Sequence, residues 1–189
     1  MANTPITSFQ EIQSEWESVL HESQADTLFL TPQWQKVWWD IFGDGRTMCG
    51  FSYHETDGAP DGVAAIASLA KSGDTVTFVG SQDTFDYNDF PIRPGHEEGF
   101  YRSLLECMEE QEVSLLRLDS LRENSPTLEL LPEMARGLGY TVEIEQEDVT
   151  SGINLPATWD EYLGMLNKKD HHELRRKLRR LDSRPTGNG

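Results

Sequence analysis

Two groups of residues in this sequence carry side chains that could bind a ligand or take part in catalysis. The first is a tetrad of carboxylates, phenol and amide that follows a short apolar run: Asp86, Tyr87, Asn88 and Asp89. Such side chains can hydrogen-bond the hydroxyls and amines of a sugar or a peptide. Asp86 or Asp89 could also act as a general base. The alternative is an Asx-rich turn in which Phe85 and Phe90 fill the core, and both interpretations stay open.

The second group is a basic segment near the end of the chain. Lys168 to Arg184 contains eight Lys/Arg and three Asp/Glu, whereas the rest of the chain has eight basic and 30 acidic residues and the whole chain carries a net charge of -17. Five residues of the segment are candidates for binding anions such as phosphates: Lys168, Lys169, Arg175, Arg176 and Arg179. An acidic body with a basic C-terminal segment is therefore the clearest feature of the composition.

The basic segment also predicts an amphipathic helix. Leu174, Leu178 and Leu181 follow at spacings of four and three, and this apolar stripe needs a partner surface. Three hypotheses stay open: contact with ligand phosphates, binding to nucleic acid or a membrane surface, and a linker helix whose charges face solvent or pair with the acidic body. The last is favoured modestly. Aromatic residues do not interleave with the basic ones, so no specific nucleic-acid partner is predicted.

Other chemistry finds little support in the sequence. Cys49 and Cys107 form no CxxC pair and lie near no histidine cluster, which predicts free thiols and no metal site. His171 and His172 are adjacent and point to different faces of a helix, so they are not a ligand pair. No catalytic residue can be named. No apolar run is long enough to span a membrane and the N-terminus does not look like a signal peptide, so we expect a cytoplasmic protein without a membrane span.

Helix and strand signals predict one mixed α/β domain. Ser8 with Glu11 suggests a capping box for a first helix, and Thr31-Pro32 opens a second. Short apolar runs separated by turns at Asp57-Gly58 and at 72–74 then predict an antiparallel meander. Further elements are expected at the following places: helices at 97–110 and from Ser125-Pro126, a buried strand at 113–118, strands at 140–144 and 152–155, and a helix from Thr158 with Glu161 that continues through the basic segment.

The expected architecture is therefore two helices, an antiparallel meander and a β-α-β-α-β arrangement, which form a mixed sheet flanked by helices. The predicted organisation is a domain at 1–166, a basic linker helix at 167–182 and a disordered tail at 183–189.

This order, together with several local strings, resembles the GNAT superfamily acyltransferases of the CelD-like, cellulose-biosynthesis-associated branch, which are related to the Fem aminoacyl transferases. Four places carry the resemblance and cover nearly the whole chain. They are residues 29–34 with Trp38-Trp39, Val79-Gly80 with the tetrad, Leu118-Asp119 with Ser125-Pro126, and 155–181 with its basic helix. The resemblance implies a GNAT-like fold corresponding to the N-terminal half of a two-domain enzyme, with the acyl-donor site in the second half.

The resemblance also implies which half of the enzyme would bind the acyl donor and which the acceptor. A complete GNAT domain holds coenzyme A on a glycine-rich loop, and neither Gly43-Asp44-Gly45-Arg46 nor the helix end at 136–140 fits that role. The chain is thus expected to be the non-catalytic half that positions the acceptor, facing it with the tetrad. No cofactor is expected in this chain, and acetyl-coenzyme A or another acyl donor would need a second GNAT-like domain. That domain, or a second copy docked through the basic helix, is the expected partner. Two alternatives remain: a stand-alone protein-interaction module that uses the basic helix, and a divergent complete N-acetyltransferase.

Overall fold

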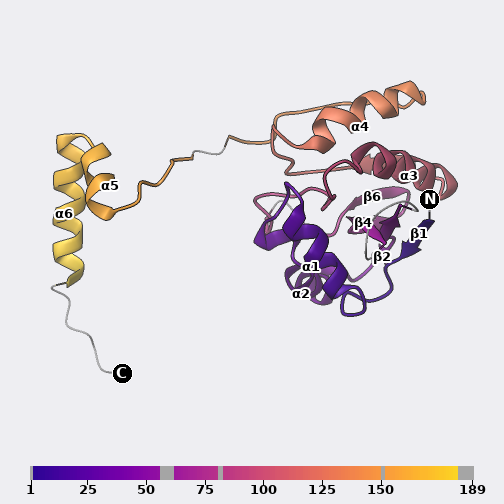
Figure 1. Ribbon diagram of the computed structural model, residues 1–189, viewed down its shortest axis with the longest axis horizontal. Coiled ribbons are helices and arrows are strands. Elements are labelled where there is room, and N and C mark those ends of the chain that lie inside the picture. Colours follow the sequence, from indigo (N-terminus) through magenta and orange to yellow (C-terminus); the bar gives the residue numbers. More distant parts are fainter. Residues whose placement is uncertain (1, 56–61, 81–82, 150–151, 183–189) are drawn as a thin grey trace. The chain divides into compact units, whose positions relative to one another are not determined.

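The computed structural model describes residues 2–55, 62–80, 83–149 and 152–182. The turn predicted at Asp57-Gly58 and the tail predicted at 183–189 lie outside these residues. The chain divides into two compact units, Met1–Glu147 and Asp148–Gly189. The first unit contains the sheets and the second contains two helices (Figure 1), so each unit is described by itself.

The strands of the first unit form two sheets. β1 (Ala2–Pro5), β3 (Phe51–His54) and β4 (Val63–Ala67) make an antiparallel sheet in the order β1-β3-β4. β2 (Thr47–Met48), β5 (Leu69–Ser72), β6 (Thr75–Phe78) and β7 (Leu115–Arg117) make the second sheet in the order β2-β5-β6-β7. In the second sheet β6 and β7 are parallel, because α3 returns the chain between them. The expectation of a mixed α/β fold is confirmed.

Two helices of the first unit begin at a side-chain cap that is followed by proline. α2 (Pro32–Phe42) follows Thr31, whose hydroxyl accepts a hydrogen bond from the Trp34 N–H at 3.3 Å, and proline occupies its first turn. α4 (Pro126–Gly137) begins in the same way at Ser125. α3 (Glu97–Glu110) has the predicted bounds. α1 (Gln13–Glu22) and the 3-10 turn η1 (Leu28–Leu30) complete the helical segments of the first unit.

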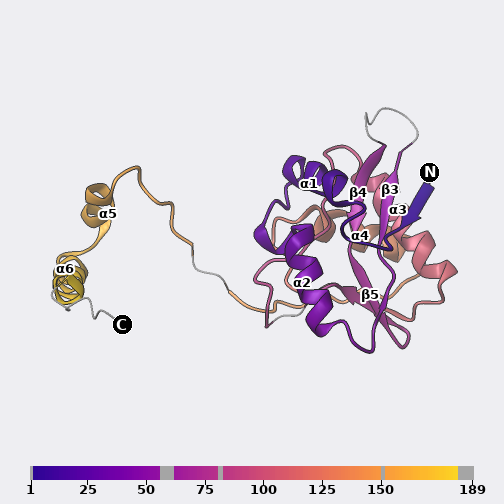
Figure 2. The ribbon, with the colours of Figure 1, turned by 90° about the horizontal axis from the view of Figure 1, so that it is seen from below.

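Two hydrophobic cores lie on opposite faces of the strands. One contains buried side chains of α3 and α4 with Tyr53, Val76 and Phe78. The other contains side chains of α1 and α2 with Ile66 and Val79. β4 lies between the two helix layers, and all five of its residues are buried, which explains its unbroken apolar run (Figure 2).

Several predicted elements were wrong, and each for a local reason. The residues at 140–144 and 152–155 form no strand, because neither segment pairs with a sheet. The strand expected to be buried at 113–118 is β7, an edge strand whose Leu115 is 51% exposed. Ser8 does not cap α1, which begins at Gln13 without a side-chain cap.

The C-terminal helix is also divided where one continuous helix was expected. The capping box of Thr158 and Glu161 is confirmed and begins α5 (Trp159–Met165). Leu166 is extended, and Asn167 then accepts a 3.0 Å hydrogen bond from the Asp170 N–H at the start of α6 (Lys168–Asp182). The new cap stabilises a second helix start and ends the first helix. α5, expected in the first domain, belongs to the second compact unit.

One glycine of α3 allows a close helix–strand contact. A Cβ added at Gly99 would lie 2.5 Å from the Tyr53 hydroxyl oxygen and 3.4 Å from the ring carbon that bears it. Tyr53 is completely buried, and its hydroxyl has no hydrogen-bond partner among the described residues. The close contact therefore requires that residue 99 has no side chain. It also leaves the Tyr53 hydroxyl without a hydrogen bond among the described residues.

We predict that Gly99→Ala lowers the free energy of unfolding by about 1–3 kcal/mol, because the methyl group overpacks the site. Tyr53→Phe alone is expected to be neutral or stabilising, since it removes an unpaired buried hydroxyl. In the double variant the cost of the alanine should fall nearly to zero. Urea denaturation of the four proteins forms a double-mutant cycle. Strictly additive effects would show that the hydroxyl does not cause the clash.

Candidate functional site

The tetrad lies at the carboxyl ends of the two parallel strands. The loop after β6 carries the tetrad, and the loop after β7 carries residues 118–125. A parallel bridge joins Asn88 to Leu121, and the Asn88 N–H donates to the Ser120 carbonyl at 2.9 Å. In α/β proteins this end of a parallel strand pair is the usual place for a ligand. The topology thus brings a predicted site into a position suited to binding.

Asp89 fastens this loop to α4. Its Oδ2 accepts a 2.6 Å hydrogen bond from the Ser125 hydroxyl, and its Oδ1 accepts bonds from the Thr127 hydroxyl and from the Phe90 N–H at 2.8 Å. The Thr127 hydroxyl also lies 3.0 Å from the Tyr101 hydroxyl of α3. Ser125, Thr127 and Tyr101 are all buried. The carboxylate therefore holds together one loop and two helices.

Burial raises the pKa of Asp89 above its usual value. The hydrogen bonds from Ser125, Thr127 and Phe90 and the charge of Arg122 oppose this rise without cancelling it. The folded state therefore favours the protonated carboxyl more than the unfolded chain does. Since both oxygens already accept hydrogen bonds, this carboxyl serves as a clamp.

A small pocket lies beside Asp89. Its volume is about 30 Å³, enough for a group of one or two heavy atoms. Its lining comes from three separate stretches of the chain: Gln24, Ala25, Thr27 and Leu30; Tyr87, Asn88 and Asp89; and Arg122, Asn124, Ser125 and Pro126. Two buried oxygens of this lining, Thr27 Oγ1 and Asn88 Oδ1, have no hydrogen-bond partner among the described residues. Asn88 is only 6% exposed, so its amide oxygen lies away from bulk solvent.

The remaining members of the tetrad take different positions. Tyr87 lines the pocket, and the Arg122 guanidinium stacks on its ring at 4.0 Å from the centroid. Asp86 is exposed and is not part of the lining. Phe85 and Phe90 are buried in the cores, as the alternative interpretation expected. The loop therefore fills the core with its two phenylalanines and presents Tyr87, Asn88 and Asp89 to the pocket.

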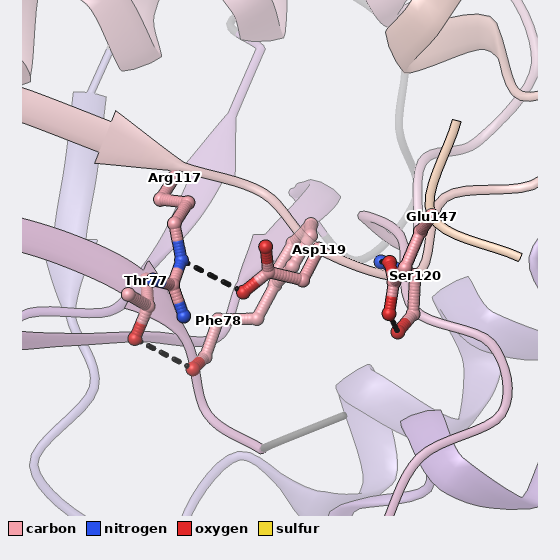
Figure 3. A network of polar contacts seen from close by, with 6 residues as sticks. All are labelled: Thr77, Phe78, Arg117, Asp119, Ser120 and Glu147. Carbon is pink, nitrogen blue, oxygen red and sulfur yellow. Dashed lines mark hydrogen bonds and ion pairs between the residues drawn. The ribbon is translucent and has the colours of Figure 1, made fainter. Parts of the chain in front are cut away.

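The loop after β7 is held from a second side by Glu147. The Glu147 carboxylate accepts hydrogen bonds from the Ser120 N–H at 2.7 Å and the Ser120 hydroxyl at 3.3 Å (Figure 3). Ser120 has a positive φ of 62°, an uncommon conformation for a residue with a side chain. Arg117 donates to Asp119 at 2.9 Å in the same stretch. These contacts fix the backbone that supports Asn88.

The predicted anion-binding residues separate on α6. Lys168 and Arg175, with His171, line a hollow between α5 and α6, whereas Lys169 and Arg179 do not. Arg176 forms a two-point ion pair with Glu173 at 2.6 and 2.8 Å. The structure thus brings two of the five predicted residues together and uses a third within the helix.

Sequence reasoning missed most of the pocket lining. Thr27 and Arg122 carry no local signal for a binding site, and Ser125 was identified only as a helix start. Their roles arise because the fold brings distant segments together. The Ser125-Pro126 cap was the one available hint, since it places hydroxyls at the end of α4 that faces the tetrad.

Comparisons of the chain with known protein families, with curated proteins and with solved structures found no match. The fold and the site define a mixed α/β protein with a small polar pocket, and the GNAT resemblance stays a prediction.

Among the described residues, no helix is long and apolar enough to cross a membrane. The same residues contain no group of three or more His, Cys, Asp or Glu side chains arranged to hold a metal ion.

The raised pKa of Asp89 predicts a pH dependence that Asp89→Asn removes. As pH rises from about 4, the usual range for aspartate, the native carboxyl must lose a proton that the unfolded chain has already lost. The contribution of Asp89 to stability therefore falls until pH exceeds its native pKa. Relative to wild type, the Asn variant should gain stability between pH 4 and pH 7, as measured by urea denaturation.

Asp86→Asn is the matched control, because it removes a carboxylate from the exposed part of the same loop. It should leave the pH dependence of the wild type nearly unchanged. If Asp89→Asn instead lost stability relative to wild type as pH rose, the hydrogen bonds would outweigh burial, and the direction assigned to the pKa would be wrong.

Proposed function

We propose that residues 1–147 bind the amine or hydroxyl of an acceptor and position it for acyl or aminoacyl transfer, with the acyl donor held by another domain. The observation that carries the proposal is the pair of unpaired buried oxygens, Thr27 Oγ1 and Asn88 Oδ1, in one polar pocket. The resemblance to the acceptor-positioning half of GNAT-type enzymes supplies the reaction class.

The chemistry of the pocket favours a hydrogen-bond donor. Asn88 Oδ1 can only accept a hydrogen bond, and the Thr27 hydroxyl can either donate or accept. A hydroxyl or an amine could donate to Asn88 and exchange a second bond with Thr27. Each unpaired buried group costs about 1–3 kcal/mol, and binding such a group would recover part of that cost.

Arg122 adds a second recognition element at the pocket. Its guanidinium lies over the Tyr87 ring, 4.0 Å from the centroid, and the hydrogen bonds of the described residues include none that it donates. The donors at the edge of this held guanidinium can bind a carbonyl or carboxylate oxygen. The arrangement suits an acceptor that carries an amine or hydroxyl close to such an oxygen.

The test is Thr27→Val, a change of nearly equal shape that removes one unpaired oxygen. We expect the free energy of unfolding to rise by about 1 kcal/mol, because a buried group without a partner is lost. Binding of ethanolamine, a small probe with both an amine and a hydroxyl, should weaken about tenfold. The probe is followed by NMR through the side-chain amide signals of Asn88.

Tyr53→Phe is the matched control, because it also removes an unpaired buried hydroxyl but lies away from the pocket. It should leave ethanolamine binding unchanged. A wild-type protein that shows no saturable shift with the probe would contradict the proposal. So would a Thr27→Val variant that is less stable than wild type, since the hydroxyl would then have a structural partner such as a fixed water molecule.

A further inference from the structure

A second site lies in the second unit, in the hollow between α5 and α6. It is shallow and largely open to solvent, with a volume of about 510 Å³. Leu163, buried to 6% exposure, and the half-buried Leu166 supply apolar walls. Lys168, His171 and Arg175 enter from α6, and their spacing of three and four residues places them on one face of the helix.

Lys168 and Arg175, the permanently charged groups of this face, form no ion pair with the described acidic residues of their own helix. The ion pairs among the described residues include none of Lys168, His171 and Arg175. Glu173 pairs with Arg176 and lies 3.9 Å from Lys177, and Asp170 accepts a 2.6 Å hydrogen bond from Asn167. Glu173 and Asp170 are thus engaged outside the lining, and Asp160 is the one carboxylate among the described lining residues.

Gly164 borders the hollow and offers a position from which a side chain could fill it. It lies in the last turn of α5 and lines the hollow. A Cβ added there would meet no atom within 4 Å, and its backbone is not in the positive-φ region. Neither packing nor backbone conformation therefore requires glycine at this position, although glycine destabilises a helix relative to alanine. A larger residue would project into the open space.

We propose that this hollow binds a phosphate-bearing ligand, through Lys168 and Arg175 with His171 beside them. Exposed lysine and arginine side chains on one face suit the several oxygens of a phosphate or pyrophosphate group. The apolar walls contributed by Leu163 and Leu166 suit a ligand with an uncharged part next to the phosphate. This site belongs to the second unit, so the proposal does not depend on whether the pocket of the first unit binds an acceptor.

The test uses isothermal titration calorimetry of the whole chain with inorganic pyrophosphate at constant ionic strength. We expect saturable one-to-one binding. Lys168→Ala/Arg175→Ala should weaken it at least about tenfold, because two charge-assisted contacts are lost. The matched variant Lys169→Ala/Arg179→Ala removes the same charge from positions outside the lining and should change affinity by less than about twofold.

Gly164→Leu should weaken binding without changing any charge, and circular dichroism checks that its helices remain.

Vesicles of phosphatidylcholine with and without phosphatidic acid distinguish the source of the phosphate. Phosphatidic-acid binding with the same dependence on the variants would support the site and assign the phosphate to a lipid headgroup. Equal losses in the two double variants would overturn the proposal, because binding would then follow net charge alone. Binding of neither probe would overturn it too, as would a preference for duplex DNA that falls steeply with salt.

Discussion

A partly buried carboxyl group, that of Asp89, links three elements of the first unit through hydrogen bonds. Asp89 accepts hydrogen bonds from its own loop and from two hydroxyls at the start of α4, and Thr127 extends the network to Tyr101 of α3. Buried polar groups are costly unless all are satisfied, and satisfied networks fix a single arrangement. Leu131 and Ala135 of α4 lie in the same core as Tyr53 and Val76 of the strands, so core packing and the Asp89 carboxyl together position the start of α4.

The same network explains how a small polar pocket can exist beside a well-packed core. Asp89 accepts hydrogen bonds from three donors, and a carboxylate has no proton to offer the Asn88 oxygen, so the oxygens of Asn88 and Thr27 keep no partner among the described residues. Sites that bind polar ligands commonly sacrifice stability in this way, because groups arranged for a ligand are poorly arranged for folding alone. The same loop thus carries the hydrogen-bonded carboxyl of Asp89 and, next to it, the Asn88 oxygen that has no partner among the described residues.

The sequence predicted what short-range chemistry controls. The bounds of α3, the caps at Thr31, Ser125 and Thr158, and the tetrad as a polar loop all follow from neighbouring residues. Strands at 140–144 and 152–155 were wrong because a strand also needs a partner edge. Local spacing could not tell that Asn88 faces the pocket while Asp86 faces solvent, or that Thr27 joins them. Those facts depend on contacts between segments that lie far apart in the chain.

The open edge of β7 has a consequence for how copies of this protein behave in concentrated solution. β7 ends the strand order of its sheet and carries an exposed leucine, and such an edge strand can pair with another chain. Residues 1–147 carry 27 acidic and eight basic side chains, and the resulting mutual repulsion opposes such an encounter. The acidic composition thus opposes association of two copies through this sheet edge. Added salt weakens that opposition, because it screens the repulsion between the like charges.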